Sequence, residues 1–128
     1  MRLLVCGSRG WKDAFMVLDA LLPLRYHREL VVIIEGECPD SPDVISRDIA
    51  KALRIPYEPY PADWKKHGQR AGFIRNRQMR DEGQPTNGLA FWDGHSRGTK
   101  DMIDLLQEAG IPVEVVYPKE VNRESSRV

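Results

Sequence analysis

The chain has 128 residues, which is enough for one domain with its own core, and no second domain is needed. Its 19 basic and 19 acidic residues cancel, which excludes the broad positive field behind non-specific DNA binding and leaves room only for a local basic patch. The two cysteines match neither a disulfide framework nor a metal-ligand spacing, and no apolar run is long enough to span a bilayer. We therefore expect a soluble, cytoplasmic domain that needs no metal, no cofactor and no membrane.

Predicted strands and helices alternate in the first part of the chain. The apolar run RLLVC at 2–6 predicts a strand, which two glycines end. Apolar residues then recur at helical spacing from 13 to about 28 and predict a helix with one broad buried face, kinked or shortened by Pro23. The run LVVIIEG at 30–36 is typical of a central strand in a parallel sheet. The apolar positions of the predicted helix are Phe15, Val17, Leu18, Leu21, Leu22 and Leu24.

Turn residues and prolines mark the middle of the chain. A second amphipathic helix runs to about Leu53, with Ser41 or Asp40 as its N-cap. The segment IPYEPYPADW at 55–64 predicts an edge strand, because each of its prolines removes a donor from the sheet. The polar segment at 69–82 nevertheless has helix formers throughout. One face of that helix carries Ala71, Ile74, Arg75, Gln78 and Met79.

The last part of the chain completes the pattern with a strand at 88–92, a helix at 99–109 and a strand at 111–117. Five alternations of strand and helix predict a parallel sheet with right-handed crossovers. The predicted fold class is therefore α/β: a single Rossmann-like domain at 1–118, with a five-stranded, mostly parallel sheet and helices on both faces. The polar tail at 119–128 is expected to be flexible.

Ligands of such sheets bind outside the carboxyl ends of the strands, where the strand order reverses. Three loops lie at strand ends that lead into helices: GSRGW after the first strand, GECPDSPD after the second, and DGHSRGT after the fourth. The candidate ligand-binding residues in these loops are Gly7, Ser8, Arg9, Gly36, Asp43, Ser96, Arg97, Gly98 and Thr99.

The stretch HSRGT combines small residues, a hydroxyl and the start of a helix, which together suit a phosphate. An equally simple interpretation is that Gly98 and Thr99 only turn the chain and cap the helix. Glu35 lies where dinucleotide-binding sheets hold an acid for the ribose, but GSRGW is not a complete GxGxxG. The sequence therefore does not support an NAD-dependent dehydrogenase.

Arg75 in the segment RNRQM shares its predicted helical face with Ala71 and Met79, so its guanidinium should meet the protein. Because arginine does not lose its charge, it either pairs with a carboxylate such as Asp43 or Asp63 or lines a cleft and meets an anion. Arg75 and its neighbour Asn76 therefore join the candidate ligand-binding residues.

Aromatic residues near the loops have two interpretations. Trp11 and Trp92 follow the first and fourth strands, where they either stack on a base or, as is commoner, cover the core. Trp64 is interpreted as a packing residue. His95 lies in the candidate loop and is a possible hydrogen-bonding partner for a ligand, but the sequence gives it no catalytic partner.

Three motifs together resemble the YspA-like family of the SLOG superfamily: VCGSRGW, PADWKKHGQRAGFIRNRQM and LAFWDGHSRGTKDMI, in that order along the chain from about 2 to 116. The resemblance implies a Rossmann-like fold that binds nucleotides or nucleotide-derived ligands. Relatives in the superfamily include the Lonely Guy phosphoribohydrolases and the DNA-processing protein that loads recombinase on single strands. Members commonly self-associate, so a homo-oligomer is consistent with the resemblance.

The resemblance also assigns roles to individual positions. Three groups of residues match family elements: the first ligand loop at 7–9, the R-x-x-x-M element at Arg75 and Met79, and the G-T phosphate-binding helix start at 98–99. The chain departs from the pattern where it has Ser41, Pro42 and Asp43 in place of G-A-D, and where WDGHSRGT replaces a glycine pair. It has Met102 where the Lonely Guy enzymes need a glutamate, which argues against the phosphoribohydrolase reaction.

Three functions are therefore open. The first is a sensor or binding module for a small nucleotide-like ligand. The second is a hydrolase that cleaves an N-glycosidic or phosphate bond, with Arg75 stabilising charge and Asp43, Asp93 or Asp101 as base. The third is single-stranded nucleic-acid binding through the cations of KKHGQR and RNRQMR, which zero net charge disfavours.

Overall fold

Five strands form one parallel sheet in a computed structural model that describes residues 1–27 and 29–119. The strand order is β3-β2-β1-β4-β5, so the order reverses between β1 and β4. This confirms the predicted α/β class and single Rossmann-like domain, with every neighbouring pair of strands parallel. The strands are β1 (Arg2–Gly7), β2 (Val32–Glu35), β3 (Tyr57–Pro59), β4 (Asn87–Phe91) and β5 (Val113–Val116).

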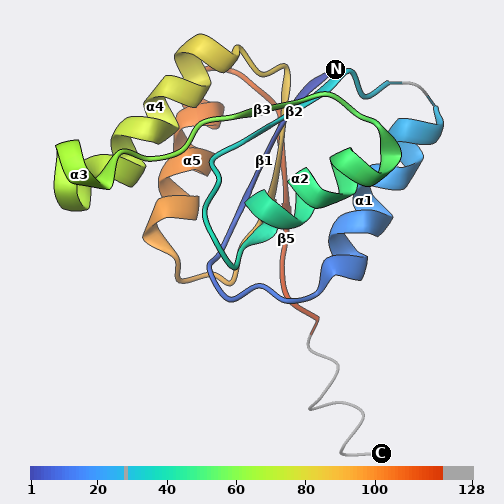
Figure 1. Cartoon of the computed structure of the whole chain (residues 1–128), viewed down its shortest axis with the longest axis horizontal. Coiled ribbons are helices and arrows are strands. Elements are labelled where there is room, and N and C mark those ends of the chain that lie inside the picture. The colour runs from blue at the N-terminus through green and yellow to red at the C-terminus, as the bar shows by residue number, and fades with distance from the viewer. Residues whose placement is uncertain (28, 120–128) are drawn as a thin grey trace, which may run out of the picture.

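Helices cover both faces of the sheet (Figure 1). One face carries α1 (Ala14–Tyr26) and α2 (Pro42–Leu53), and the other carries α4 (Ala71–Gly83) and α5 (Arg97–Glu108). The short helix α3 (Trp64–His67) and a 3₁₀ turn (Gly68–Arg70) lead into α4. No helix within the described ranges is both long and apolar enough to cross a membrane.

The two hydrophobic cores follow from the alternation of side chains along β1. Leu3 and Val5 point toward α1 and α2, whereas Leu4 and Cys6 point toward α4 and α5. All four side chains are buried, as in a central strand. The carboxyl end of β1 therefore opens between the two layers, next to the point where the strand order reverses.

The first helix packs one face on the core, with Val17, Leu21 and Leu24, but the prediction was wrong for Phe15 and Leu22. Val17 and Leu21 are fully buried, but Phe15 is 76% exposed and Leu22 is 40% exposed. Val17 and Leu21 fix the face that meets the sheet, and Phe15 and Leu22 lie roughly a third of a turn away from the middle of that face, so they point outward. The helix ends at Tyr26 and continues through Pro23.

The predicted face of the polar helix, now α4, was also partly wrong. Ile74 and Gln78 are exposed, whereas Asn76 is buried together with Ala71 and Met79. The inner face of α4 meets both the sheet and α5, and Asn76 lies at the contact with α5. A pattern of apolar residues does not identify a polar residue at a helix–helix contact.

Other boundaries agree with the sequence. Of the two predicted caps, Ser41 is the N-cap of α2, because its Oγ accepts a hydrogen bond from Asp43 N at 3.1 Å. The proline-rich β3 lies at the edge of the sheet, as predicted. The predicted tail lies outside the described residues except for Lys119.

Candidate functional site

A cavity of about 280 Å³ opens at the carboxyl end of β1, next to α4 and the start of α5. It adjoins the reversal of strand order, where Rossmann-like sheets hold their ligands. Of the predicted residues, it is lined by Gly7, Arg9, Asp43, Arg75, Asn76, Ser96, Gly98 and Thr99.

Three predicted residues do not line this cavity. Ser8 is buried and its Oγ accepts a hydrogen bond from Asp93 N at 3.0 Å, so it joins the loops that follow β1 and β4. Gly36 lies beneath the Arg75 side chain, and Arg97 is exposed on the first turn of α5. Gly36 thus supports the cavity wall from behind, and Ser8 borders a second cavity, described below.

Arg75 is anchored to the protein without an ion pair. Its Nη1 donates to the carbonyl oxygen of Gly36, and its Nε donates to Asn76 Oδ1 at 3.0 Å. Within residues 1–27 and 29–119, no carboxylate lies within 4.0 Å of the guanidinium and Nη2 has no hydrogen-bond partner. Asp63, one of its predicted partners, instead caps α3 by accepting from Lys66 N at 3.1 Å. Arg75 thus lines the cavity with a guanidinium whose Nη2 has no hydrogen-bond partner among the described residues.

The start of α5 forms the opposite part of the wall. Ser96 is its N-cap, with Oγ 3.4 Å from Thr99 N and 3.1 Å from Thr99 Oγ1. An ideal Cβ on Gly98 would meet no heavy atom within 4 Å, so the space beside this residue is open. The first turn of a helix offers N–H groups without helical partners and a partial positive charge. This surface suits an anion.

Asn76 fixes the start of α5 against α4. Its Nδ2 donates to the Gly98 carbonyl oxygen and to Asp101 Oδ2, both at 3.1 Å, while its Oδ1 accepts from Arg75. The side chain is 4% exposed, and all three of its hydrogen bonds go to the protein. Asn76 thus lines the cavity but acts as a brace between Arg75 and Gly98.

Among the described residues, Asp43 is the only one that brings a carboxylate to the cavity wall. Burial raises its pKa to about 6, while the Arg75 guanidinium and the N–H groups of Cys38 and Gly36 oppose that rise. A carboxyl group with this pKa exchanges protons near neutral pH. The Cys6 thiol also borders the cavity, but burial and Asp43 raise its pKa, so it stays protonated. The described residues hold no group of three or more metal-binding side chains.

Two aromatic residues of the cavity wall were missed in the sequence. Trp64 on α3 and Phe73 on α4 both line it and are 54% and 40% exposed, so the interpretation of Trp64 as a packing residue was wrong. The sequence did contain a feature that could have identified them, because Trp64 and Phe73 are aromatic residues in an otherwise polar segment. Other lining residues that the sequence did not single out for a site are Cys38, Gln69 and Gly72.

The other two tryptophans cover the core, as favoured from the sequence. Trp11 is 7% exposed and packs edge-on against Phe91, with ring centroids 5.4 Å apart. Trp92 packs against Tyr117, and its Nε1 donates to Ser96 O at 3.0 Å. The His95 side chain is exposed and lies outside the cavity lining.

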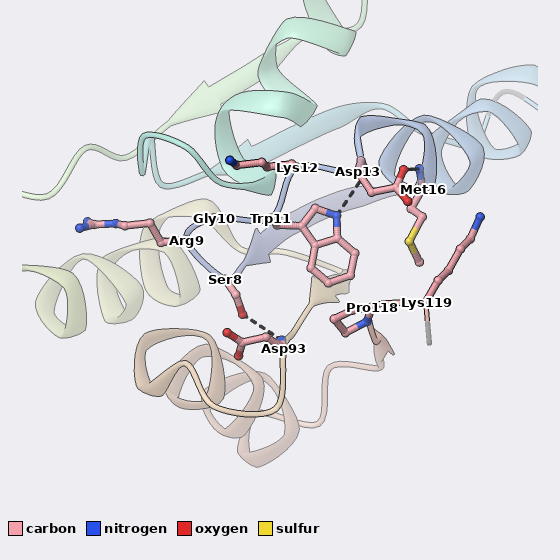
Figure 2. Close-up of a pocket in the computed structure, with 10 residues that line it drawn as sticks. All are labelled: Ser8, Arg9, Gly10, Trp11, Lys12, Asp13, Met16, Asp93, Pro118 and Lys119. Atoms are coloured by element: carbon pink, nitrogen blue, oxygen red, sulfur yellow. Dashed lines mark hydrogen bonds between the residues drawn. The ribbon is translucent and has the colours of Figure 1, made fainter. Parts of the chain in front are cut away.

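A second cavity of about 440 Å³ lies where the loop after β1 approaches the segment after β5 (Figure 2). The helix start beside it carries a negative charge, because its N-cap is Asp13, whose Oδ1 accepts from Met16 N at 3.1 Å. Asp93, a second carboxylate in the wall, accepts from the N–H groups of His95 and Ser96, which hold its pKa below the usual range. Arg9, Lys12 and Lys119 also border this cavity. Its helix start is capped by a carboxylate, however, whereas α5 is capped by the neutral hydroxyl of Ser96, so this cavity suits a phosphate less well than the first.

Fold and site together define a Rossmann-like α/β domain with a cleft at its reversal of strand order. The chain belongs to the YspA, cpYpsA-related SLOG family, whose model matches residues 1–67. It is also 36% identical over 118 residues to the Gene 61 protein of Mycobacterium phage D29, across 88% of this chain and 93% of that protein. These matches confirm the family resemblance. No solved structure matches the chain.

Proposed function

We propose that this domain binds a nucleotide or nucleotide-derived phosphate ligand in the cavity beside Arg75, as a sensor or binding module. Membership of the SLOG family supports a nucleotide-related ligand. The observation that carries the proposal is that one cavity is bordered both by a guanidinium with a free donor and by the capped start of a twelve-residue helix. Such a pairing of cation and helix start favours a phosphate group.

The charges around the cavity support the same ligand class. Among the described residues that line the cavity, Arg9 and Arg75 are cationic and Asp43 is anionic, so cations outnumber anions in the wall. The chain as a whole has no net charge, so this excess is local. Gly98 adds room at the helix start, because its missing side chain leaves space for a phosphate oxygen to reach the backbone.

The proposal is tested by a thermal-shift screen of the purified protein. The panel contains nucleoside mono-, di- and triphosphates, NAD, ADP-ribose, cyclic nucleotides and short single-stranded DNA. A ligand at about one hundred times its dissociation constant adds about 2.7 kcal/mol, which raises Tm by several degrees. A shift with DNA alone would instead favour nucleic-acid binding, and no shift with any nucleotide would contradict the proposal.

Gly98→Ala separates binding from folding. The new methyl group meets no protein atom within 4 Å, and alanine is the better helix former by about 1 kcal/mol, so Tm should stay unchanged or rise. Nucleotide binding should weaken, because the methyl group fills the space beside the helix start. Undiminished affinity in this variant would show that the phosphate does not lie there.

Arg75→Gln removes the charged donor and has a matched control on the same helix. Arg77 is exposed, pairs with Asp101 at 3.3 Å and does not line the cavity. We expect Arg75→Gln to weaken nucleotide binding by about 1.5–3 kcal/mol, the range for a hydrogen bond to a charged group, and Arg77→Gln to leave it unchanged. Equal nucleotide affinities of the two variants would show that Arg75 does not bind the ligand.

Hydrolysis of an N-glycosidic or phosphate bond is the second candidate, supported by Asp43. Its carboxyl group borders the cavity and has a pKa raised to about 6, which suits a general acid or base. Asp101 is engaged by Asn76 and Arg77, and Asp93 lies outside this cavity. The candidate predicts turnover of a bound nucleotide that Asp43→Asn abolishes while binding persists. Recovery of unchanged nucleotide after long incubation would exclude it.

A further inference from the structure

We propose that Trp64 and Phe73 form a platform on which the base of the bound nucleotide stacks, so that the site distinguishes a nucleotide from a bare sugar phosphate. This inference rests on the proposed function and adds a part of the ligand that Arg75 and α5 do not address. It concerns two aromatic residues that come from different helices and border one cavity.

Both rings are unusually exposed for their type. Trp64 is 54% exposed on the four-residue helix α3, and Phe73 is 40% exposed on the first turns of α4. A single exposed aromatic residue needs no explanation, but Trp64 and Phe73 line the same cavity, so each offers an apolar ring to whatever binds there. The indole Nε1 of Trp64 donates no hydrogen bond to any described residue, in contrast to the indole groups of Trp11 and Trp92.

The platform lies beside the free donor of Arg75. An ideal Cβ on Gly72 would be 3.7 Å from Trp64 Cη2 and 3.8 Å from Arg75 Nη2, so the indole edge and the guanidinium border the same point. Gly72 carries no side chain between them. If the phosphate of a nucleotide binds Arg75 Nη2, the indole of Trp64 is therefore within reach of the nucleoside attached to that phosphate.

A nucleobase fits this position chemically. Every base has a π-face that stacks on an aromatic side chain, whereas a sugar phosphate without a base has none. Arg75 lies beside the ring and places a cation near the stacked base, so its guanidinium attracts the electron-rich face of the base. The cavity wall thus combines an anion site at Arg75 and α5 with a stacking surface at Trp64 and Phe73.

The test compares AMP, GMP, CMP and UMP with ribose 5-phosphate by isothermal titration calorimetry and tryptophan fluorescence. We expect at least one nucleotide to bind at least about tenfold more tightly than ribose 5-phosphate, in line with the contribution of one stacked base. Trp64→Leu should remove this advantage, and Trp64→Phe, which keeps a ring, should retain most of it. Phe15→Leu changes another exposed aromatic residue, on α1 and outside the cavity lining, and should change nothing.

The outcomes separate the two proposals. Equal binding of nucleotides and ribose 5-phosphate, or a preference for nucleotides that survives Trp64→Leu, would overturn the stacking platform and leave the phosphate site standing. Absence of binding by all five compounds at millimolar concentration would overturn the proposed function for these ligands and the platform with it. Quenching of the wild-type fluorescence by a bound nucleotide, lost in Trp64→Phe, would support the platform directly.

Discussion

The guanidinium of Arg75 lies directly over the backbone of Gly36, and an ideal Cβ on Gly36 would come within 2.7 Å of Arg75 Cζ. The two residues are 39 positions apart in the sequence, and Arg75 Nη1 donates to the Gly36 carbonyl oxygen. This contact connects the carboxyl end of β2 to α4. It explains why a glycine follows Glu35, since a larger residue would occupy the position of the guanidinium.

Gly36→Ala should therefore displace Arg75. The guanidinium is the far end of a flexible side chain and can move aside, so we expect a loss of only about 1 kcal/mol in the free energy of unfolding, from the hydrogen bond to Gly36, together with weaker nucleotide binding. Urea denaturation measures the first effect and calorimetry the second. Gly72→Ala is the matched control for stability, because its new Cβ would make only ordinary contacts, at 3.7 Å or more, within a helix that favours alanine. Unchanged nucleotide binding by Gly36→Ala would contradict the role given to Gly36.

The sequence predicts the fold well because the pattern of buried strands is strong. The run at 30–36 and the alternation of elements were sufficient to predict a parallel sheet. The outward positions of Phe15 and Leu22 were not predictable, because a helix with apolar residues around most of its circumference does not show which side meets the sheet. Tertiary packing decides that orientation.

The candidate site is predictable only in part. Glycine-containing loops at strand ends indicated the positions of Gly7, Gly98 and Thr99, since topology brings such loops together. The roles of Asn76 and Gly36 depend on contacts across 22 and 39 residues, which no local pattern contains. Trp64 required the structure, because its exposure follows from the position of the short helix α3.

Asn76→Ala should separate α4 from the start of α5. The substitution removes two donor bonds at 3.1 Å and leaves the carbonyl oxygen of Gly98 and the Nε of Arg75 without these partners. We expect a loss of about 1–3 kcal/mol in the free energy of unfolding, because the unpaired groups are partly buried. Gln78→Ala, at an exposed position of the same helix, should change stability by no more than about 0.5 kcal/mol. Chemical denaturation of both variants measures this difference. If Asn76→Ala left the free energy of unfolding unchanged, the hydrogen bonds of Asn76 would not be what holds α5 against α4.

Glu35 is a fully buried carboxyl group at the end of β2. Burial raises its pKa to about 8, and the nearby carboxylates of Glu37 and Asp43 act in the same direction. Its Oε1 accepts from Glu37 N at 2.8 Å, while Oε2 has no hydrogen-bond partner among the residues that the structure describes. The side chain is therefore protonated at neutral pH, and it is not accessible to a ribose.

The stability of the protein should fall with pH for this reason. The native state keeps the Glu35 proton up to a pKa of about 8, whereas the unfolded chain loses it near 4.5, so the folded state binds more protons and the free energy of unfolding decreases as pH rises between these values. Asp43 acts in the same direction only up to about pH 6. Between pH 6 and 8, Glu35 should therefore lower stability by up to about 1.4 kcal/mol for each pH unit.

The test compares how the free energy of unfolding changes with pH in two variants. Its slope should be shallower in Glu35→Gln than in the wild type between pH 6 and 8, whereas Glu114→Gln, at an exposed position, should have the slope of the wild type. Urea denaturation at pH 6, 7 and 8 measures the slopes, and parallel slopes for Glu35→Gln and the wild type would refute a buried, protonated Glu35.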